Sequence, residues 1–376
     1  MGDVFAERSE KSQDGNEELL SVTLKDGVIK SESLDRKNTA SLDKRNYKLV
    51  IPNDIAYNSM RMWQGALGVS KFSGIVSPAY TVIKLRNQLE NPYFYQYYFK
   101  KNEMLNVFRK NSQGLTSDTW NLKYPLFSRI RFFTASTREQ QQISSLLYLL
   151  DQTITLHEEK KHQLERLKSA LLQKMFADKS GYPDIRFEGF SDEWEQCKAK
   201  ELFESKSKKD HSDLPVLSAT QENGIVFRND LDIDIKFDTH ALSNYKVVSP
   251  GDYIISLRSF QGGFELSEKL GIISPAYTVF AFNNQEEKRH NNTFWKYLFK
   301  RYDFIESLKR LTFGIRDGKA ISFTQFSTLK LSFPNFDEQN KIAKLLHELD
   351  RTITLHDQKL NLLKLVKQSL LQNMFI

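Results

Sequence analysis

A block from the middle of this 376-residue chain recurs near its end. Residues 139–176 and 338–375 align at a constant offset of 199, and 20 of the 38 aligned positions are identical. Neither block contains proline or glycine, so each is expected to form one long helix. The period is too long for a solenoid, whose units are roughly 20–50 residues long. The chain therefore predicts a duplicated unit, a domain followed by a helix.

The segments before the two blocks also repeat, in pieces. Residues 77–82 (SPAYTV) recur at 274–279, and residues 94–100 align with 294–300. These segments contain short β-rich runs that proline and glycine interrupt. We therefore expect an α+β fold with two repeated α/β domains and two long antiparallel coiled-coil helices in pseudo-twofold symmetry. The expected segments are a first domain (1–138), a central helix (139–180), a second domain (181–337) and a C-terminal helix (338–376).

Apolar residues in both blocks recur at alternating three- and four-residue steps, which is typical of a coiled-coil seam. A long helix with one apolar stripe needs a partner stripe, and the other copy is the obvious partner. We interpret the two seam histidines as polar residues that set the register, so no metal site is expected. The predicted seam consists of Ile143, Leu147, Leu150, Ile154 and His157 in the first copy and Ile342, Leu346, Leu349, Ile353 and His356 in the second.

Composition restricts the class of protein. The net charge is +7 and the pI is about 9.1, which favours a polyanionic partner. Cys197 is the only cysteine, which excludes an intrachain disulfide and suits a reducing cytoplasm. No run of 18 apolar residues exists, so we expect a cytoplasmic protein that does not use the membrane.

Basic and amide side chains gather near glycine-containing turns of both domains. Arginine pairs well with guanine edges and glutamine with adenine edges, whereas lysine mostly meets phosphate. The pair Arg61 and Gln64 recurs as Arg258 and Gln261, although a solvated surface charge remains the alternative for any single residue. The predicted DNA-binding residues are Lys48, Arg61, Gln64, Lys71, Lys246, Arg258, Gln261, Arg316 and Lys319.

Two motifs suggest catalysis only weakly. Residues 91–94 (NPYF) resemble the Asn-Pro-Pro-aromatic loop of amino-methyltransferases but lack its second proline, so we interpret Asn91 as a helix cap. Residues 183–184 (PD) and 286–288 (EEK) match a nuclease pattern, but about 100 residues separate them. We interpret this match as coincidence and expect no catalytic residue and no cofactor in this chain.

The order of domain, helix, domain and helix resembles the specificity subunit of type I restriction–modification systems. So do residues 186–195 (RFEGFSDEWE) before the second domain and the LLQxMF helix ends at 171–176 and 370–375. The resemblance covers nearly the whole chain. It implies that each domain reads one half of a split DNA target, and that the helices fix the gap between the half-sites.

The resemblance also implies the partners. These would be double-stranded DNA, two modification (methyltransferase) subunits docked on the helices, and restriction subunits that translocate and cleave DNA. S-adenosylmethionine, ATP and Mg²⁺ would then be bound by those subunits. In one respect the chain departs from the family pattern, because the first copy has no counterpart of residues 181–196. The chain looks shortened at its start, and we expect the first strand, or its contact with the terminal helix, to be affected.

Two other functions fit the same sequence. One is a coiled-coil scaffold whose two modules bind proteins or glycans, and unchanged gel mobility of DNA with all partner subunits present would favour it. The other is a self-contained nuclease or methyltransferase. In that case the purified chain alone would turn over DNA, and Asp184→Ala or Asn91→Ala would abolish the activity.

Overall fold

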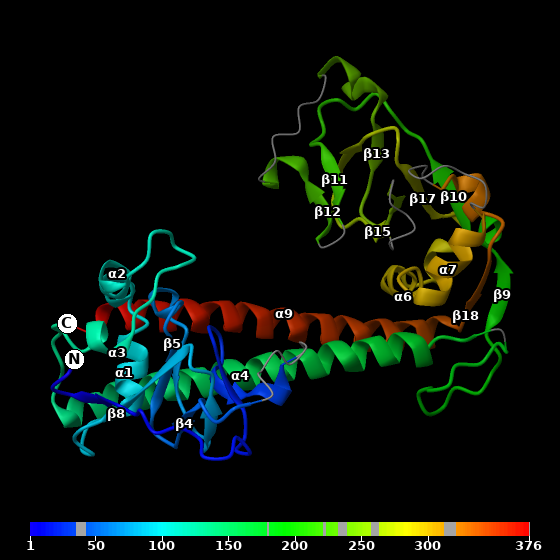
Figure 1. The fold of residues 1–376 in the computed structure, drawn as a ribbon. Coiled ribbons are helices and arrows are strands. Elements are labelled where there is room, and N and C mark those ends of the chain that lie inside the picture. The colour runs from blue at the N-terminus through cyan, green and yellow to red at the C-terminus, as the bar shows by residue number, and fades with distance from the viewer. Residues whose placement is uncertain are drawn as a thin grey trace. The chain divides into compact units, whose positions relative to one another are not determined.

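A computed structural model of the chain contains two compact units (Figure 1). The first consists of Met1–Glu158 with Gln358–Ile376, and the second of Glu159–Asp357. Each unit therefore takes part of both long helices. The structure describes residues 1–34, 43–178, 180–220, 223–231, 239–256, 263–311 and 321–375.

A four-stranded antiparallel sheet forms the centre of the first unit. Its strands, in spatial order, are β1 (Phe5–Glu7), β8 (Tyr80–Leu85), β5 (Ile55–Asn58) and β6 (Leu67–Val69). The first strand thus forms and pairs with β8. Two further pairs are β2 (Leu20–Thr23) with β3 (Gly27–Lys30) and β4 (Lys48–Val50) with β7 (Gly74–Val76). The helices are η1 (Ser31–Ser33), η2 (Met62–Gln64), α1 (Pro92–Tyr98), α2 (Asn102–Asn111) and α3 (Tyr124–Phe127).

The second unit repeats this plan in the same element order. Its sheet runs β10 (Phe203–Lys206), β17 (Thr278–Phe282), β14 (Tyr253–Ile255) and β15 (Phe264–Leu266). The smaller pairs are β11 (Leu217–Thr220) with β12 (Gly224–Phe227), β13 (Lys246–Val248) with β16 (Gly271–Ile273), and β9 (Glu195–Lys198) with β18 (Lys330–Phe333). The helices are α5 (Ala199–Leu202), η3 (Arg228–Asp230), η4 (Thr239–Asn244), η6 (Glu287–Arg289), α6 (Asn292–Leu298), α7 (Tyr302–Leu311) and α8 (Phe323–Phe326).

The duplication extends to single hydrogen bonds. The Asn91 side chain accepts hydrogen bonds from the backbone N–H groups of Tyr93 and Phe94 at the start of α1. Asn291 caps α6 in the same way. An asparagine at this position satisfies donors that have no partner within the helix. The interpretation of residues 91–94 as a helix cap is thereby confirmed.

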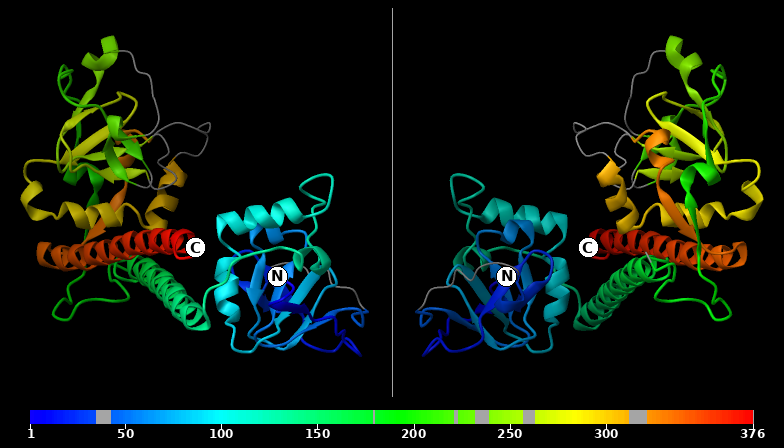
Figure 2. Two further views of the ribbon diagram at one scale, coloured as in Figure 1. Left: turned by 90° about the vertical axis from the view of Figure 1, so that its left-hand side faces the viewer. Right: turned by 90° about the vertical axis from the view of Figure 1, so that its right-hand side faces the viewer.

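The two long helices are α4 (Thr137–Lys174) and α9 (Phe336–Asn373), each of 38 residues. Within each unit, a part of α4 lies beside a part of α9 (Figures 1 and 2), and ion pairs fix their relative direction there. Because later residues of α4 pair with earlier residues of α9, the helices are antiparallel, which confirms the predicted fold class. The pairs are Asp151–Lys367 and Glu158–Lys364 in the first unit and Lys161–Asp357 and Lys168–Asp350 in the second.

The predicted seam residues take two kinds of position. Those nearest the start of each helix are buried in the core of the adjoining domain: Ile143 and Leu147 in the first unit, and Ile342 and Leu346 in the second. Ile154 is also buried, 8% exposed. The others are half-buried: Leu150, His157, Leu349, Ile353 and His356.

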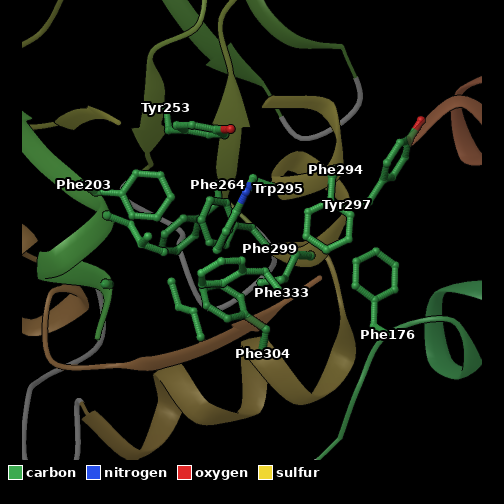
Figure 3. Close-up of a cluster of buried hydrophobic side chains, with 14 of the residues drawn as sticks. Phe176, Phe203, Tyr253, Phe264, Phe294, Trp295, Tyr297, Phe299, Phe304 and Phe333 are labelled. Carbon is green, nitrogen blue, oxygen red and sulfur yellow. The ribbon is translucent and has the colours of Figure 1, made fainter. Parts of the chain in front are cut away.

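Aromatic side chains dominate the core of the second unit (Figure 3). Trp295 of α6 is fully buried, and its ring centre lies 5.3 Å from that of Phe203 and 5.4 Å from that of Phe333. Edge-to-face and tilted ring pairs of this kind contribute beyond their buried area. Side chains from strands β10 and β18 and from helix α6 thus meet in one packed cluster.

A buried histidine in this core should make the second unit sensitive to acid. His290 is stacked on Phe282 and contacts Glu286 and Gln339, with Arg289 nearby. Burial lowers the pKa of His290 despite the opposing effect of Glu286. Below about pH 6.5 the unfolded chain therefore binds a proton that the folded unit does not.

We expect the free energy of unfolding of this unit to fall between pH 7.5 and pH 5.5, by about 1.4 kcal/mol per unit of pKa difference. His290→Gln should flatten the profile, measured by hydrogen exchange of peptides from α6. His162→Gln, at an exposed position of α4, is the matched control and should keep the wild-type profile. An unchanged slope in His290→Gln would contradict the assignment.

Candidate nucleic-acid interface

A hollow of about 970 Å³ opens on the first domain. Its wall comes from β2, the turn that holds η2, the segment before β8 and the loop at residues 117–118. The recurring motif at residues 77–82 supplies Ser77, Ala79 and Tyr80. Polar groups and aromatic edges thus surround one concave surface.

Two predicted DNA-binding residues, Arg61 and Gln64, lie on this hollow. Arg61 directly precedes the short helix η2, and Gln64 is its last residue. Gly65, the next residue, has a left-handed conformation with φ of +87°. Glycine adopts this conformation without the steric cost that a side chain would incur. Both side chains are exposed, and no described residue accepts or donates a side-chain hydrogen bond to either. Their hydrogen-bonding groups are therefore available to a ligand.

Two indole rings support the same turn. Trp63 lies between Arg61 and Gln64 in sequence, and its ring centre is 5.2 Å from that of Trp120 in an edge-to-face arrangement. Trp63 also donates a hydrogen bond from Nε1 to the carbonyl of Met60. The hydrogen bond lies within the turn that carries Arg61 and Gln64, and the ring contact holds this turn against the loop that contains Trp120.

Three predicted lysines lie elsewhere. Lys48 of β4 forms an ion pair with Glu7, and Lys71 lies 5.8 Å from the ring centre of Tyr148 on α4. Lys246 donates a hydrogen bond to the carbonyl of Tyr277, and burial lowers its pKa. Neither Lys48 nor Lys71 lines the hollow. The remaining predictions, Arg258, Gln261, Arg316 and Lys319, lie outside the described residues.

The hollow also contains residues that the sequence did not single out. Tyr47, Trp63 and Tyr80 are the aromatic ones, and Ser117 and Asp118 provide a hydroxyl and a carboxylate. A tryptophan directly between Arg61 and Gln64 was an available signal, because aromatic residues interleaved with basic ones are common in nucleic-acid sites. The contribution of Ser117 and Asp118 depends on loop folding and had no local signal.

The residues of the weak nuclease pattern are held by separate local contacts. Glu286 contacts Arg289 and His290, while the nearest basic group to Asp184 is the Lys174 ammonium, 3.9 Å away. Across the described part of the chain, no three His, Cys, Asp or Glu side chains gather in a metal-ligating group. None of the described helices is both long and apolar enough to cross a membrane.

A family model described as "Type I restriction modification DNA specificity domain" matches this chain twice, at residues 2–166 and 191–365. The chain belongs to this family. The two matches together cover most of the sequence, and each contains one repeated domain with part of the helix that follows it. The resemblance noted in the sequence is thereby confirmed, and the chain is a type I specificity subunit by domain content.

Solved structures of specificity subunits share this fold. The S subunit of a type I restriction–modification system from M. genitalium is 15% identical, with a TM-score of 0.57, and the match covers 100% of this chain and 94% of that one. The HsdS subunit from Thermoanaerobacter tengcongensis is also 15% identical, with a TM-score of 0.50 and coverage of 98% and 94%. At this identity the likeness concerns the fold.

Proposed function

We propose that this specificity subunit is a non-catalytic reader of a bipartite DNA sequence. Each repeated domain reads one half-site, and methyl transfer and cleavage take place in other subunits. The observation that carries the proposal is that the DNA specificity domain occurs twice in this chain. In the first domain, the side chains of Arg61 and Gln64 leave donor and acceptor groups free on the hollow. The net charge of +7 supports an anionic ligand.

In the first domain, we assign base reading to Arg61 and Gln64. Both side chains extend from a turn that is held by Gly65 and by the Trp63–Trp120 contact. The Arg61 guanidinium suits the two acceptors of guanine, and the Gln64 amide suits the donor and acceptor of adenine. Lysine residues outside the hollow, such as Lys71, would contribute phosphate contacts that carry no sequence information.

The helices would separate the half-sites and dock partner subunits. At 1.5 Å per residue, each 38-residue helix is about 57 Å long. The paired helices leave large apolar side chains exposed, which marks protein-binding surfaces. These include Leu149, Leu156, Leu355, Leu362 and Leu365, which are 54–65% exposed.

We propose two modification subunits as the proteins that cover these leucines, joined by restriction subunits. S-adenosylmethionine, ATP and Mg²⁺ would be bound by those partner subunits and not by this chain. A subunit that assembles in this way on DNA works in the cytoplasm.

Methylome sequencing of cells that express the assembled system tests the proposal. We expect two half-sites with a fixed gap, and DNA binding that weakens steeply with salt because phosphate contacts release counterions. A single contiguous target would contradict bipartite reading. Unchanged gel mobility of DNA with all subunits present would favour the scaffold instead.

Arg61→Ala and Gln64→Ala test the reading residues. Each should relax the preference at one position of a single half-site by about 1–3 kcal/mol, because a bidentate base contact is lost. Sequence selection by the assembled complex would measure this. Arg109→Ala removes an equal charge from an exposed position of α2 outside the hollow and should leave both half-sites unchanged. Equal losses at both half-sites would contradict the assignment.

A further inference from the structure

The turn that carries Arg61 and Gln64 also presents an apolar side chain to the hollow. Met60, the residue before Arg61, lines the same concave surface and is 43% exposed. Met62, two residues later, is fully buried in the core of the first unit. One methionine therefore anchors the turn to the core, while the other remains on the surface beside the two polar side chains that we assign to base reading.

Hydrogen bonds at both polar groups of its backbone fix the position of Met60. Its N–H donates to Oδ1 of Asn58 at 3.0 Å, and its carbonyl accepts from Nε1 of Trp63 at 3.2 Å. Asn58 is the last residue of β5 in the central sheet, and the ring of Trp63 packs against Trp120. The backbone of Met60 is thus held by the sheet on one side and by the indole pair on the other.

The side chain of Met60 is free to adapt to a ligand. It belongs to neither apolar core of the first domain. A methionine side chain is unbranched and flexible, and its polarizable thioether fits apolar surfaces of irregular shape. A fixed backbone that carries a flexible apolar side chain suits contact with a small apolar group.

The second copy has a large apolar residue at the equivalent position. Residues 58–64 (NSMRMWQ) align with residues 255–261 (ISLRSFQ), so Leu257 precedes Arg258 as Met60 precedes Arg61. Leu257 lies outside the described residues. The repeated sequence pattern therefore contains an apolar residue together with the arginine and the glutamine.

The groups that base pairs expose in the major groove limit what Met60 can contact there. Guanine presents two acceptors, adenine an acceptor and a donor, and cytosine a donor. Thymine presents an acceptor and its C5-methyl group, which is the only alkyl group in the groove. Arg61 and Gln64 match the polar edges of guanine and adenine, so the apolar side chain beside them matches the thymine methyl group.

We propose that Met60 contacts the C5-methyl group of a thymine in the first half-site and thereby selects an A·T pair at that position. This inference rests on the proposed function, because it takes the turn to lie in the major groove. Leu24 also lines the hollow and is 47% exposed, but it lies in the turn between β2 and β3. Met60 shares its turn with Arg61 and Gln64, so it lies beside the base edges that they contact.

Deoxyuridine provides the probe, because it lacks only the methyl group of thymidine. The target comes from the methylome, and the first half-site is the one in which Arg61→Ala relaxes the preference. Each thymine of that half-site is replaced in turn, and the affinity of the assembled complex is measured by fluorescence anisotropy. We expect replacement at one position to weaken binding by about fourfold, the loss that corresponds to one buried group of methyl size.

Three variants assign the contact to Met60. Met60→Ala should bind unmodified DNA about fourfold more weakly than the wild type, and it should no longer distinguish deoxyuridine from thymidine. Met60→Leu keeps an apolar side chain and should retain the distinction. Leu24→Ala removes an exposed apolar side chain from another part of the same hollow and should retain the distinction as well.

Two kinds of result would overturn the inference and leave bipartite reading intact. One is a first half-site that tolerates deoxyuridine at every thymine, or that contains no thymine on either strand. The other is a sensitivity to the missing methyl group that persists in Met60→Ala or disappears in Leu24→Ala. Loss of all DNA binding in Met60→Ala would also contradict a single methyl contact. A wild-type complex that binds neither half-site would contradict the proposed function itself, and this inference with it.

Discussion

Insertion of four residues into each long helix should lengthen the gap between the half-sites and leave both half-sites unchanged. The insertion sites lie between Leu156 and His157 in α4 and between Leu355 and His356 in α9, beside the boundary between the two units. The same four residues, Thr-Ile-Thr-Leu, precede both sites, so duplicating them preserves the local sequence. Four residues add about 6 Å and about one helical turn.

At 3.4 Å per base pair, this extension corresponds to about two base pairs. Methylome sequencing would report it directly as a longer gap in the modified target. Leu156→Ala, which changes an exposed side chain at the same place without changing the length, is the control and should leave the gap unchanged. Altered half-sites with an unchanged gap would refute the assignment of the helices as a spacer.

Replacement of Trp295 by alanine should destabilise the second unit by about 3–5 kcal/mol, because a large fully buried ring leaves a cavity. The first unit has its own core, so its hydrogen exchange should stay close to wild type. An assembled complex should then lose preference for the second half-site and keep the first. Protection of α6 and of α1, measured separately by hydrogen exchange, distinguishes these outcomes.

Two further variants complete this experiment. Trp295→Phe should cost less than alanine, because a ring is kept and the indole Nε1 has no hydrogen-bond partner among the described residues. Tyr302→Ala removes an aromatic ring of the same unit that is 72% exposed and should change stability by no more than about 0.5 kcal/mol. Equal destabilisation of both units by Trp295→Ala would show that they do not unfold separately.

Much of the fold could be predicted from sequence, because duplication makes the chain its own comparison. The equal helices followed from their constant offset and from the absence of proline and glycine, and the Asn91 cap followed from its short side chain before Pro92. The order of strands in the sheets had no such signal. The pairing of β1 with β8 joins residues about 80 positions apart, and no local pattern of residues specifies that pairing.

The site was predicted less completely. Arg61 and Gln64 were found because they recur in both copies, and they do lie on the hollow. Lys48 was predicted alongside Arg61 because both are basic. Its ion pair with Glu7 of strand β1, about 40 residues earlier in the chain, could not be read from the local sequence. Trp120 approaches Trp63 only through a loop that packs across the domain. The local spacing of Arg61 and Gln64 therefore identified the turn that carries them. Tertiary contacts determine which basic side chains have no partner within the protein and remain available to a ligand.

The discontinuity of the first unit has a consequence for how the protein is made. Residues 358–375 are synthesised about 200 residues after Glu158, yet Phe375 is buried in the first core and its carbonyl accepts a hydrogen bond from Lys101. At about 5–20 residues per second, ribosomes need roughly 10–40 s for this stretch. The second unit is contiguous and can fold first during translation. The first unit cannot complete its core until residues 358–375 have been synthesised. Chaperones therefore have the longest time to act on the first unit, although it is synthesised earliest.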